Sequence, residues 1–251
     1  MITHAIVRPP GASFARAISS SGAAIDVALA QAQHAEYRQA LVAAGVEVEV
    51  LLPDEGYPDS CFMQDPALVI AGTAVIARPG AASRLGEEAS VAQALAGRFP
   101  LARIVPPGTL EGGDVLILPD RVVVGISART NRAGIAQLAG ALSAVGLPVY
   151  EAPVDGYLHL LTAVTHLGEG RLLAVEGFAV PPPLAGRPVL RVPADEAYAC
   201  NALGIGANVI LPAGYPKTSA MLRSHGFEVL PVPTTEFAKA DGGVTCLSLA
   251  W

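Results

Sequence analysis

Residues 40–53 read ALVAAGVEVEVLLP, which is an apolar helix end, a glycine and then a short strand rich in valine. The same succession returns at residues 141–150 (ALSAVGLPVY) and at residues 221–231 (MLRSHGFEVLP). A glycine placed directly after a helix adopts the left-handed conformation that ends the helix at little cost. Three such endings in one chain indicate a repeated structural unit, and a repeat of this length governs the whole fold.

Amphipathic helices precede these endings, and pairs of apolar strands precede the helices. The expected apolar helix faces consist of Val91, Leu95 and Phe99 in one helix and of Ile135, Leu138, Leu142 and Val145 in another. Asn131 is the expected N-cap of the second helix, because its side chain can accept a hydrogen bond from a free backbone N–H. Strand pairs joined by turns are expected at residues 67–77, 115–125 and 160–175.

The unit is therefore strand, strand, helix, strand, and the chain accommodates five of them. Units begin near Asp65, Asp114, His159, Asn201 and Gly243. The last one has to be completed by the N-terminal strand, a helix over residues 24–44 and a strand over residues 46–52, which closes a ring and removes open sheet edges. We therefore expect an α/β fold: a five-bladed ββαβ propeller with pseudo-fivefold symmetry, forming a single domain over residues 1–251.

One unit departs from this pattern. Three successive prolines, residues 181–183, stand where the unit that begins at His159 should have its helix. Proline lacks a backbone N–H and clashes with the preceding turn, so a regular helix is not expected there.

The composition restricts the class of function. The 251 residues are 52% hydrophobic and 15% charged, which provides ample apolar material for a large core. A net charge of −6 without a Lys or Arg cluster argues against nucleic acid or an anionic membrane as partner and suits a small cationic molecule. No signal peptide precedes Pro9 and no apolar stretch could span a bilayer, so a cytoplasmic protein is expected.

The cysteines do not indicate a disulfide framework or a metal site. Cys61, Cys200 and Cys246 are few, odd in number and far apart, without the paired spacing of zinc ligands. We expect no metal and no organic cofactor.

Chemically reactive side chains recur at the interval of the repeated unit. Asp65, Glu111 and His159 are separated by about 46 and 48 residues, and Cys246 follows after about twice that interval, where a glycine turn meets an apolar strand. Equivalent positions in a ring of similar units converge on its axis, so these four side chains would share one space. Carboxylates beside a thiol raise its pKa, and they suit a nucleophile only if the substrate brings a positive charge. A guanidinium, planar and always charged, is such a group.

Each of these residues also has an ordinary structural interpretation. A buried cysteine most often packs as a small hydrophobe, which is what we expect of Cys61 and Cys200. Asp65 before proline and Glu111 before two glycines could serve only to form turns.

The chain resembles the dimethylarginine dimethylaminohydrolases, members of the guanidine-modifying superfamily that share a five-bladed α/β propeller. The segments that carry the resemblance are residues 8–10 (RPP), 52–66 (LPDEGYPDSCFMQDP), 78–84 (RPGAASR), 111–114 (EGGD), 127–131 (SARTN), 158–160 (LHL), 212–216 (PAGYP) and 234–246 (TTEFAKADGGVTC). They extend over nearly the whole chain, and their order makes the resemblance specific.

The resemblance implies a role for each matching residue. It assigns Cys246 as nucleophile, His159 as general acid and base, Glu111 and Asp65 as guanidinium ligands, Arg84 and Arg129 as carboxylate ligands, and Asp59 with the backbone of Ile18 as α-amino ligands. Two positions depart from the family pattern. Gln64 stands where the family usually has glutamate, and Thr245 replaces the usual serine.

The implied reaction is hydrolysis of an Nω-substituted arginine to citrulline and an alkylamine, through a covalent thiouronium on Cys246. The substrate is a small molecule, and the sequence leaves a homodimer open. The segment 11–22 is expected to form either a mobile lid over the substrate or an ordinary connection. Alternatives are an arginine or agmatine deiminase, an amidinotransferase and, from another class, a non-catalytic propeller that only binds.

Overall fold

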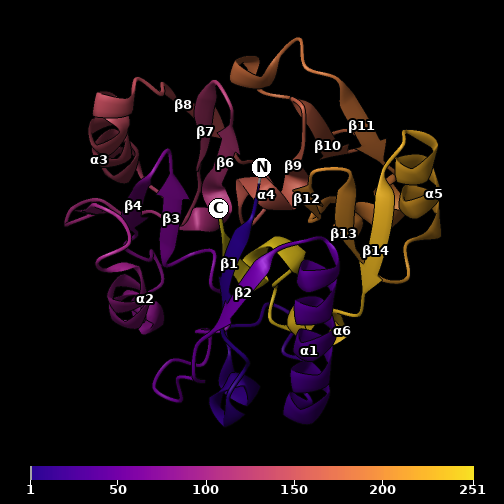
Figure 1. Cartoon of the computed structure of the whole chain (residues 1–251), viewed down its shortest axis with the longest axis horizontal. Coiled ribbons are helices and arrows are strands. Elements are labelled where there is room, and N and C mark those ends of the chain that lie inside the picture. The colour runs from indigo at the N-terminus through magenta and orange to yellow at the C-terminus, as the bar shows by residue number, and fades with distance from the viewer. Residues whose placement is uncertain (1) are drawn as a thin grey trace.

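The computed structural model describes residues 2–251 and contains five separate three-stranded sheets arranged around a common centre (Figure 1). In every sheet the middle strand pairs antiparallel with one neighbour and parallel with the other. An antiparallel pair needs only a short turn, whereas a parallel pair needs a crossover, which is usually helical. Each sheet with its crossover is thus one blade, helical in four of the five, and the predicted five-bladed α/β propeller is confirmed.

The strands of the five blades follow the chain with one exchange at its ends. They are β15 (Ser248–Ala250), β1 (His4–Val7) and β2 (Glu47–Val50); β3 (Ala67–Ile70), β4 (Thr73–Ile76) and β5 (Leu101–Arg103); β6 (Val115–Leu118), β7 (Arg121–Ile126) and β8 (Val149–Pro153); β9 (Val164–Gly168), β10 (Arg171–Val175) and β11 (Val189–Val192); and β12 (Leu203–Ile205), β13 (Asn208–Pro212) and β14 (Glu228–Val232).

Helices connect the parallel strands in four of the five blades. These helices are α1 (Val27–Ala43), α2 (Glu88–Leu95), α3 (Arg132–Leu142) and α5 (Pro216–Ser224), and the two short helices α4 (Leu160–Ala163) and α6 (Thr235–Lys239) lie outside the crossovers. In the described residues between β10 and β11 a single 3-10 turn, Pro182–Leu184, replaces the helix, as the prolines predict.

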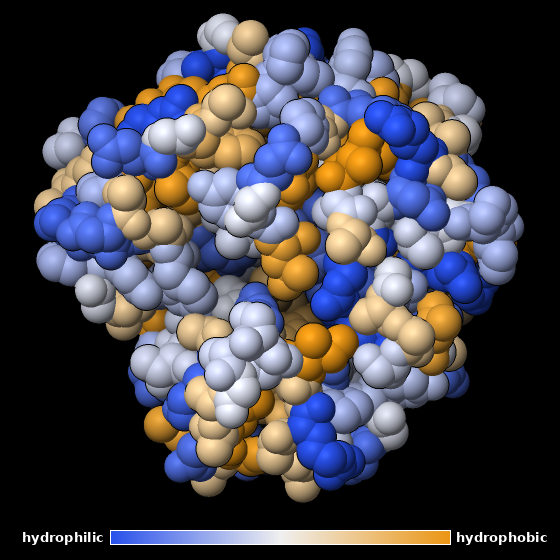
Figure 2. Space-filling view, turned by 180° about the vertical axis from the view of Figure 1, so that it is seen from behind, coloured by the Kyte–Doolittle hydropathy of each residue, from blue (hydrophilic) through white to orange (hydrophobic). Residues whose placement is uncertain are grey.

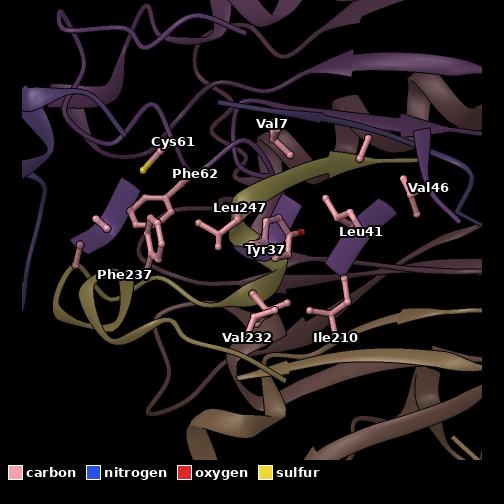
Figure 3. Packing of buried hydrophobic residues seen from close by; sticks show 14 of the residues in the cluster. Val7, Tyr37, Leu41, Val46, Cys61, Phe62, Ile210, Val232, Phe237 and Leu247 are labelled. Atoms are coloured by element: carbon pink, nitrogen blue, oxygen red, sulfur yellow. The ribbon is translucent and has the colours of Figure 1, made fainter. Parts of the chain in front are cut away.

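The two ends of the chain close the ring, as expected. Strand β1 pairs with β15 through Ala5 opposite Ala250 and with β2 through His4 opposite Glu47. The side chain of Tyr37 on α1 is fully buried, and its hydroxyl lies 2.7 Å from Oγ of Ser248. Figure 3 shows Tyr37 among apolar side chains from both ends of the chain. Burial of this shared apolar surface holds the first and last segments together.

The helix boundaries confirm the expected caps. Oδ1 of Asn131 accepts a hydrogen bond from Gly134 N at 2.9 Å, which caps α3. The three glycines that follow the quoted helix ends, Gly45, Gly146 and Gly226, have φ of 85°, 67° and 87°. These positive values explain why glycine stands there.

Three boundary predictions were wrong. Helix α2 ends at Leu95, so Phe99 lies beyond the helix although it packs against the same core cluster. Helix α3 ends at Leu142, and Val145 lies in a following 3-10 turn with 43% of its surface exposed. The strand expected from residue 160 begins only at Val164, because Leu160–Ala163 form one helical turn. An apolar run does not by itself distinguish a strand from a buried helical turn.

The space-filling view in Figure 2 shows a hollow near the middle of one face of the ring, bordered by both apolar and polar residues. Within residues 2–251, no helix has the length and apolar character needed to cross a membrane.

Candidate active site

Short helical turns at the inner ends of the blades carry the predicted reactive residues. Glu111 stands directly before the 3-10 turn Gly112–Asp114, His159 directly precedes α4, and Cys246 lies within the 3-10 turn Val244–Leu247. The sequence interpretation placed Cys246 where a glycine turn meets a strand, whereas β15 begins only at Ser248. A helical turn directs its side chains differently from a strand, so these turns set where the reactive atoms lie.

Glycines allow the turns to approach one another closely. A Cβ atom on Gly113 would lie 2.7 Å from Nδ1 of His159, and one on Gly243 would lie 2.5 Å from Oδ1 of Asn201. A Cβ on Gly112 would lie 2.0 Å from the carbonyl oxygen of Gln64. Any larger residue would push the segments apart, so glycine at these positions keeps the reactive groups together.

Glu111 and His159 form a buried pair, because Nε2 of His159 lies 2.8 Å from Oε2 of Glu111. A carboxylate only accepts hydrogen bonds, so Nε2 carries the proton in this contact. The other oxygen of Glu111 accepts from the backbone N–H of Gly80 at 2.9 Å and lies 3.4 Å from Nη1 of Arg129. Glu111 therefore fixes the orientation of the imidazole while its own position is held by the backbone.

The protonation of His159 is set by opposing effects. Burial lowers the pKa of His159, but the hydrogen bond to Glu111 and the nearby carboxylates of Asp65 and Asp114 outweigh burial, so the net pKa is raised. Asp114 also accepts a hydrogen bond from Leu160 N at 3.0 Å, at the start of α4. Asp114 thereby helps to place His159, which precedes that helix.

Asp65 is bound on both carboxylate oxygens. Its Oδ1 accepts from Gly113 N at 2.9 Å and its Oδ2 accepts from Nη1 of Arg84 at 2.7 Å. Burial raises the pKa of Asp65, but Arg84 and His159 outweigh burial and lower the net pKa, which keeps the carboxylate ionised.

The half-buried Cys246 has a raised pKa in this surrounding. Burial, and then the negative charge of Asp65, raise the pKa of Cys246 to about 12. Gly243 N, at 3.4 Å from the sulfur, and the hydroxyl of Thr245 act in the opposite direction without compensating. A cation placed beside the sulfur is therefore needed to form the thiolate.

A narrow pocket of about 30 Å³, here called the clamp, is lined by the four residues that the resemblance assigned to the amino-acid end of a substrate. These are Ile18, Asp59, Arg84 and Arg129, and Asp65, His159 and Cys246 also border the pocket. Oδ1 of Asp59 accepts from Ile18 N at 3.1 Å, and burial raises the pKa of Asp59 in spite of the nearby Arg84.

Arg84 is more constrained than expected, because it is buried between two carboxylates. Besides its bond to Asp65, it donates to Oε1 of Glu87 from Nε at 3.0 Å and from Nη2 at 2.5 Å. Sequence reasoning missed Glu87, which precedes α2 three residues after Arg84. Burial raises the pKa of Glu87 to about 7, against the opposing effect of Arg84.

A second and larger space of about 280 Å³, here called the chamber, meets the clamp at Cys246 and His159. Gln64 lines the chamber and not the clamp, and its backbone N–H donates to the carbonyl of Cys246 at 3.2 Å. Sequence reasoning also missed Tyr198, Leu161 and Thr162, which line the chamber and stand in no motif that singled them out.

The segment 11–22 crosses both spaces and is attached at several points. Ala12 N and Ser13 N donate to Glu55 at 2.8 and 2.7 Å, and Ser20 donates to Asp241 from its backbone at 2.7 Å and its hydroxyl at 2.6 Å. Ile18 borders the clamp and Ser20 borders the chamber, so this segment forms part of the wall of both spaces.

One group of ligand-type atoms is compact enough to bind a metal ion. Atoms of Asp65, Glu111 and His159 lie within 4.8 Å of one another. Both oxygens of Asp65 already have partners, one of them the cation of Arg84, and His159 is bonded to Glu111. A metal would have to displace these contacts, whereas a guanidinium needs acceptors of this kind.

Comparison with known proteins agrees with this geometry. Residues 25–167 match the family model described as arginine deiminase. The chain is 38% identical to the dimethylarginine dimethylaminohydrolase of Pseudomonas aeruginosa, over 99% of both chains, and 39% identical to that of Streptomyces coelicolor, over 90% of this chain and 87% of the relative. A solved structure of the Pseudomonas aeruginosa protein, a cysteine-to-serine variant complexed with citrulline, superposes with a TM-score of 0.96 at 37% identity over the whole of both chains.

Proposed function

The chain belongs to the dimethylarginine dimethylaminohydrolase family, within the broader arginine deiminase family, and we propose on this basis that it hydrolyses Nω-methylated L-arginine to L-citrulline and an alkylamine. One observation carries the proposal. Cys246 and His159 border the same pocket as Asp65, Asp59, Arg84 and Arg129. A nucleophile, an acid–base group and charged groups for a flat cation are thus within one substrate length.

Binding of the substrate activates the thiol. The free thiol has a pKa of about 12, so nearly all of it is protonated at neutral pH. A guanidinium bound next to Asp65 and Glu111 brings a positive charge beside the sulfur, which favours the thiolate. The nucleophile is therefore formed when the correct cation is present, which protects the sulfur from other electrophiles in its absence.

Cys246 then attacks the central guanidinium carbon, and His159 donates a proton to the departing amine. The C–N bond to the alkylated nitrogen breaks, and a thiouronium on Cys246 remains. His159 next accepts a proton from the attacking water, and loss of the thiolate releases citrulline. Glu111 holds the imidazole in the required orientation through its bond of 2.8 Å to Nε2.

The amino-acid end of the substrate is bound by the clamp. Arg129 and Arg84 are the cations available for the α-carboxylate, and Asp59 with the carbonyl side of Ile18 is suited to the α-ammonium. A pair of arginines favours an amino-acid substrate over agmatine, which has no carboxylate. We also propose that the chain acts as one domain, and a homodimer stays a prediction that sedimentation can test.

The proposal is tested by citrulline release from arginine, monomethylarginine and dimethylarginine. The Cys246→Ser variant should lose turnover by at least ~10⁴-fold while it still binds substrate, because a hydroxyl is a far weaker nucleophile at this pH. Cys61→Ala is the matched control, since Cys61 is buried and lies outside both spaces. Turnover that survives in Cys246→Ser would overturn the proposal. So would a failure of the unaltered chain to release citrulline from all three substrates.

A further inference from the structure

The clamp and the chamber differ in charge although both border Cys246 and His159. Arg84, Arg129, Asp59 and Asp65 line the clamp, and none of them lines the chamber. Asp241 is the carboxylate in the chamber lining, and both of its oxygens already accept hydrogen bonds from Ser20. The chamber therefore has one acidic side chain, already hydrogen-bonded to Ser20, and lacks the arginines of the clamp.

The walls of the chamber are apolar with a few polar atoms. Leu158, Leu161 and the ring of Tyr198 line it, and the hydroxyl of Tyr198 is engaged with Gly242 O at 2.8 Å. Its polar and apolar lining resembles that of pockets that hold uncharged organic groups.

Two polar atoms in this lining lack a hydrogen-bond partner within residues 2–251. They are Oε1 of Gln64 and Oγ1 of Thr245, and both atoms are buried. The Thr245 hydroxyl is near enough to the Cys246 sulfur to lower its pKa, but the contact lacks hydrogen-bond geometry. Buried polar atoms are costly to leave without a partner, so a ligand group is expected to supply one.

The location of the chamber defines which part of a substrate enters it. With the amino-acid end in the clamp and the guanidinium carbon at Cys246, the substituent on the far nitrogen extends past the sulfur toward Gln64 and Thr162. A volume of about 280 Å³ is close to that of pockets that hold whole small molecules, about 300 Å³ and more, and exceeds the need of one or two methyl groups.

We propose, resting on the function proposed above, that the chamber receives the Nω-substituent and that the preferred substrates are Nω-monoalkyl-L-arginines with an uncharged group of propyl size or larger. Oε1 of Gln64 is buried in the described form, and a rotation of this side chain presents it to the N–H that a monoalkylated nitrogen keeps. A dialkylated nitrogen has no such hydrogen. A carboxylate at position 64 would add a negative charge near the sulfur and raise the pKa of the thiol further, which the amide avoids.

The first test compares kcat/KM for Nω-propyl- and Nω-methyl-L-arginine. In the unaltered chain the propyl substrate should be equal or better. Thr162→Leu fills the chamber and should lower the propyl-to-methyl ratio at least ~10-fold, within the range that steric exclusion in a pocket produces. Ser143→Leu, which follows α3 outside both spaces, is the control and should leave the ratio unchanged.

The second test isolates Gln64. Gln64→Leu removes the acceptor and should lower kcat/KM for monomethylarginine relative to dimethylarginine by ~3- to 10-fold, the value of one neutral hydrogen bond. Gln64→Asn keeps an amide and should restore part of the ratio.

These outcomes separate the chamber from the reaction itself. A kcat/KM for propyl below that for methyl, or a ratio that Thr162→Leu leaves unchanged, overturns the chamber assignment while the proposed function stands. If no arginine derivative is hydrolysed, the proposed function fails. Calorimetry then still compares the affinities of the Cys246→Ser variant for Nω-methyl- and Nω-propyl-L-arginine. Tighter binding of the methyl compound than of the propyl compound overturns the chamber assignment.

Discussion

The clamp and the chamber both border Cys246, and they differ in whether their polar groups already have hydrogen-bond partners. Asp65 and Arg84 of the clamp form a buried chain of ion pairs with the adjacent Glu87, at 2.7 and 2.5 Å. In the chamber, Gln64 Oε1 and Thr245 Oγ1 have no partner within the described chain. Polar side chains that already have partners hold the geometry of a site, whereas those without partners can still bond to a ligand. Under the proposed function, the clamp fixes the position of the guanidinium and the chamber receives its substituent.

The largest expected effect comes from breaking the clamp at Arg84. Arg84→Met leaves Asp65 and Glu87 buried without their cation, and removal of one partner from such a network costs about 3–5 kcal/mol of unfolding free energy. Denaturant unfolding followed by fluorescence of Trp251 or by circular dichroism measures this. Arg98→Met is the control, because Arg98 pairs with Glu49 at 2.6 Å on the exposed surface and should cost less than about 1 kcal/mol. Equal losses of unfolding free energy in the two variants would show that the buried ion pairs of Arg84 stabilise the fold no more than the surface pair of Arg98.

Next in size is the junction of the two spaces. Gly113→Ala places a methyl group 2.7 Å from Nδ1 of His159 unless the segments move, and a displacement of about 1 Å lowers kcat by ~100-fold. Gly140→Ala is the matched control, because its Cβ would meet no atom within 4 Å in α3 and alanine favours a helix. Citrulline release measures kcat, and thermal unfolding measures the stability of each variant. Unchanged kcat in Gly113→Ala would show that His159 tolerates displacement.

The clamp should also give the stability a specific pH dependence through Glu87. Its pKa rises from 4.5 to about 7 on folding, so its contribution is fully present below pH 4.5 and is lost as the pH rises through 7. Glu87→Gln should remove this decline, which is at most ~3 kcal/mol. Unfolding free energies at pH 5 and pH 8 measure it, with Glu88→Gln as control. An identical pH dependence in Glu87→Gln and the unaltered chain would contradict a role for Glu87.

The smallest effect is expected at the segment that covers both spaces. Ser20→Ala removes the hydroxyl hydrogen bond of 2.6 Å to Asp241 but keeps the backbone bond of 2.7 Å. The free energy that holds the segment 11–22 in place should therefore fall by about 1 kcal/mol. Tryptic cleavage after the exposed Arg16 should become a few-fold faster, and bound citrulline should slow it again. Ser143→Ala is the control. A cleavage rate that citrulline does not change would favour an ordinary connection over a lid.

The repeat was readable from the sequence because each helix end has to be stopped in the same way. Gly45, Gly146 and Gly226 marked three blades, and the prolines at residues 181–183 correctly predicted the missing helix. The boundaries failed where tertiary packing decides. Leu160–Ala163 are apolar enough for a strand, and they form a helical turn whose first N–H, that of Leu160, is bound by Asp114.

The sequence by itself determined the ring, the closure of its ends and the residues that face its centre, because helix stops, apolar periodicity and the spacing of Asp65, Glu111, His159 and Cys246 are local or regular features. Only the tertiary structure decided which polar groups have partners. The chamber brings together Gln64, Thr162 and Tyr198 from blades distant in sequence, and the ion pair of Arg84 with Asp65 joins residues 19 positions apart. Burial and hydrogen bonding depend on neighbours in space, and no spacing along the chain records those neighbours.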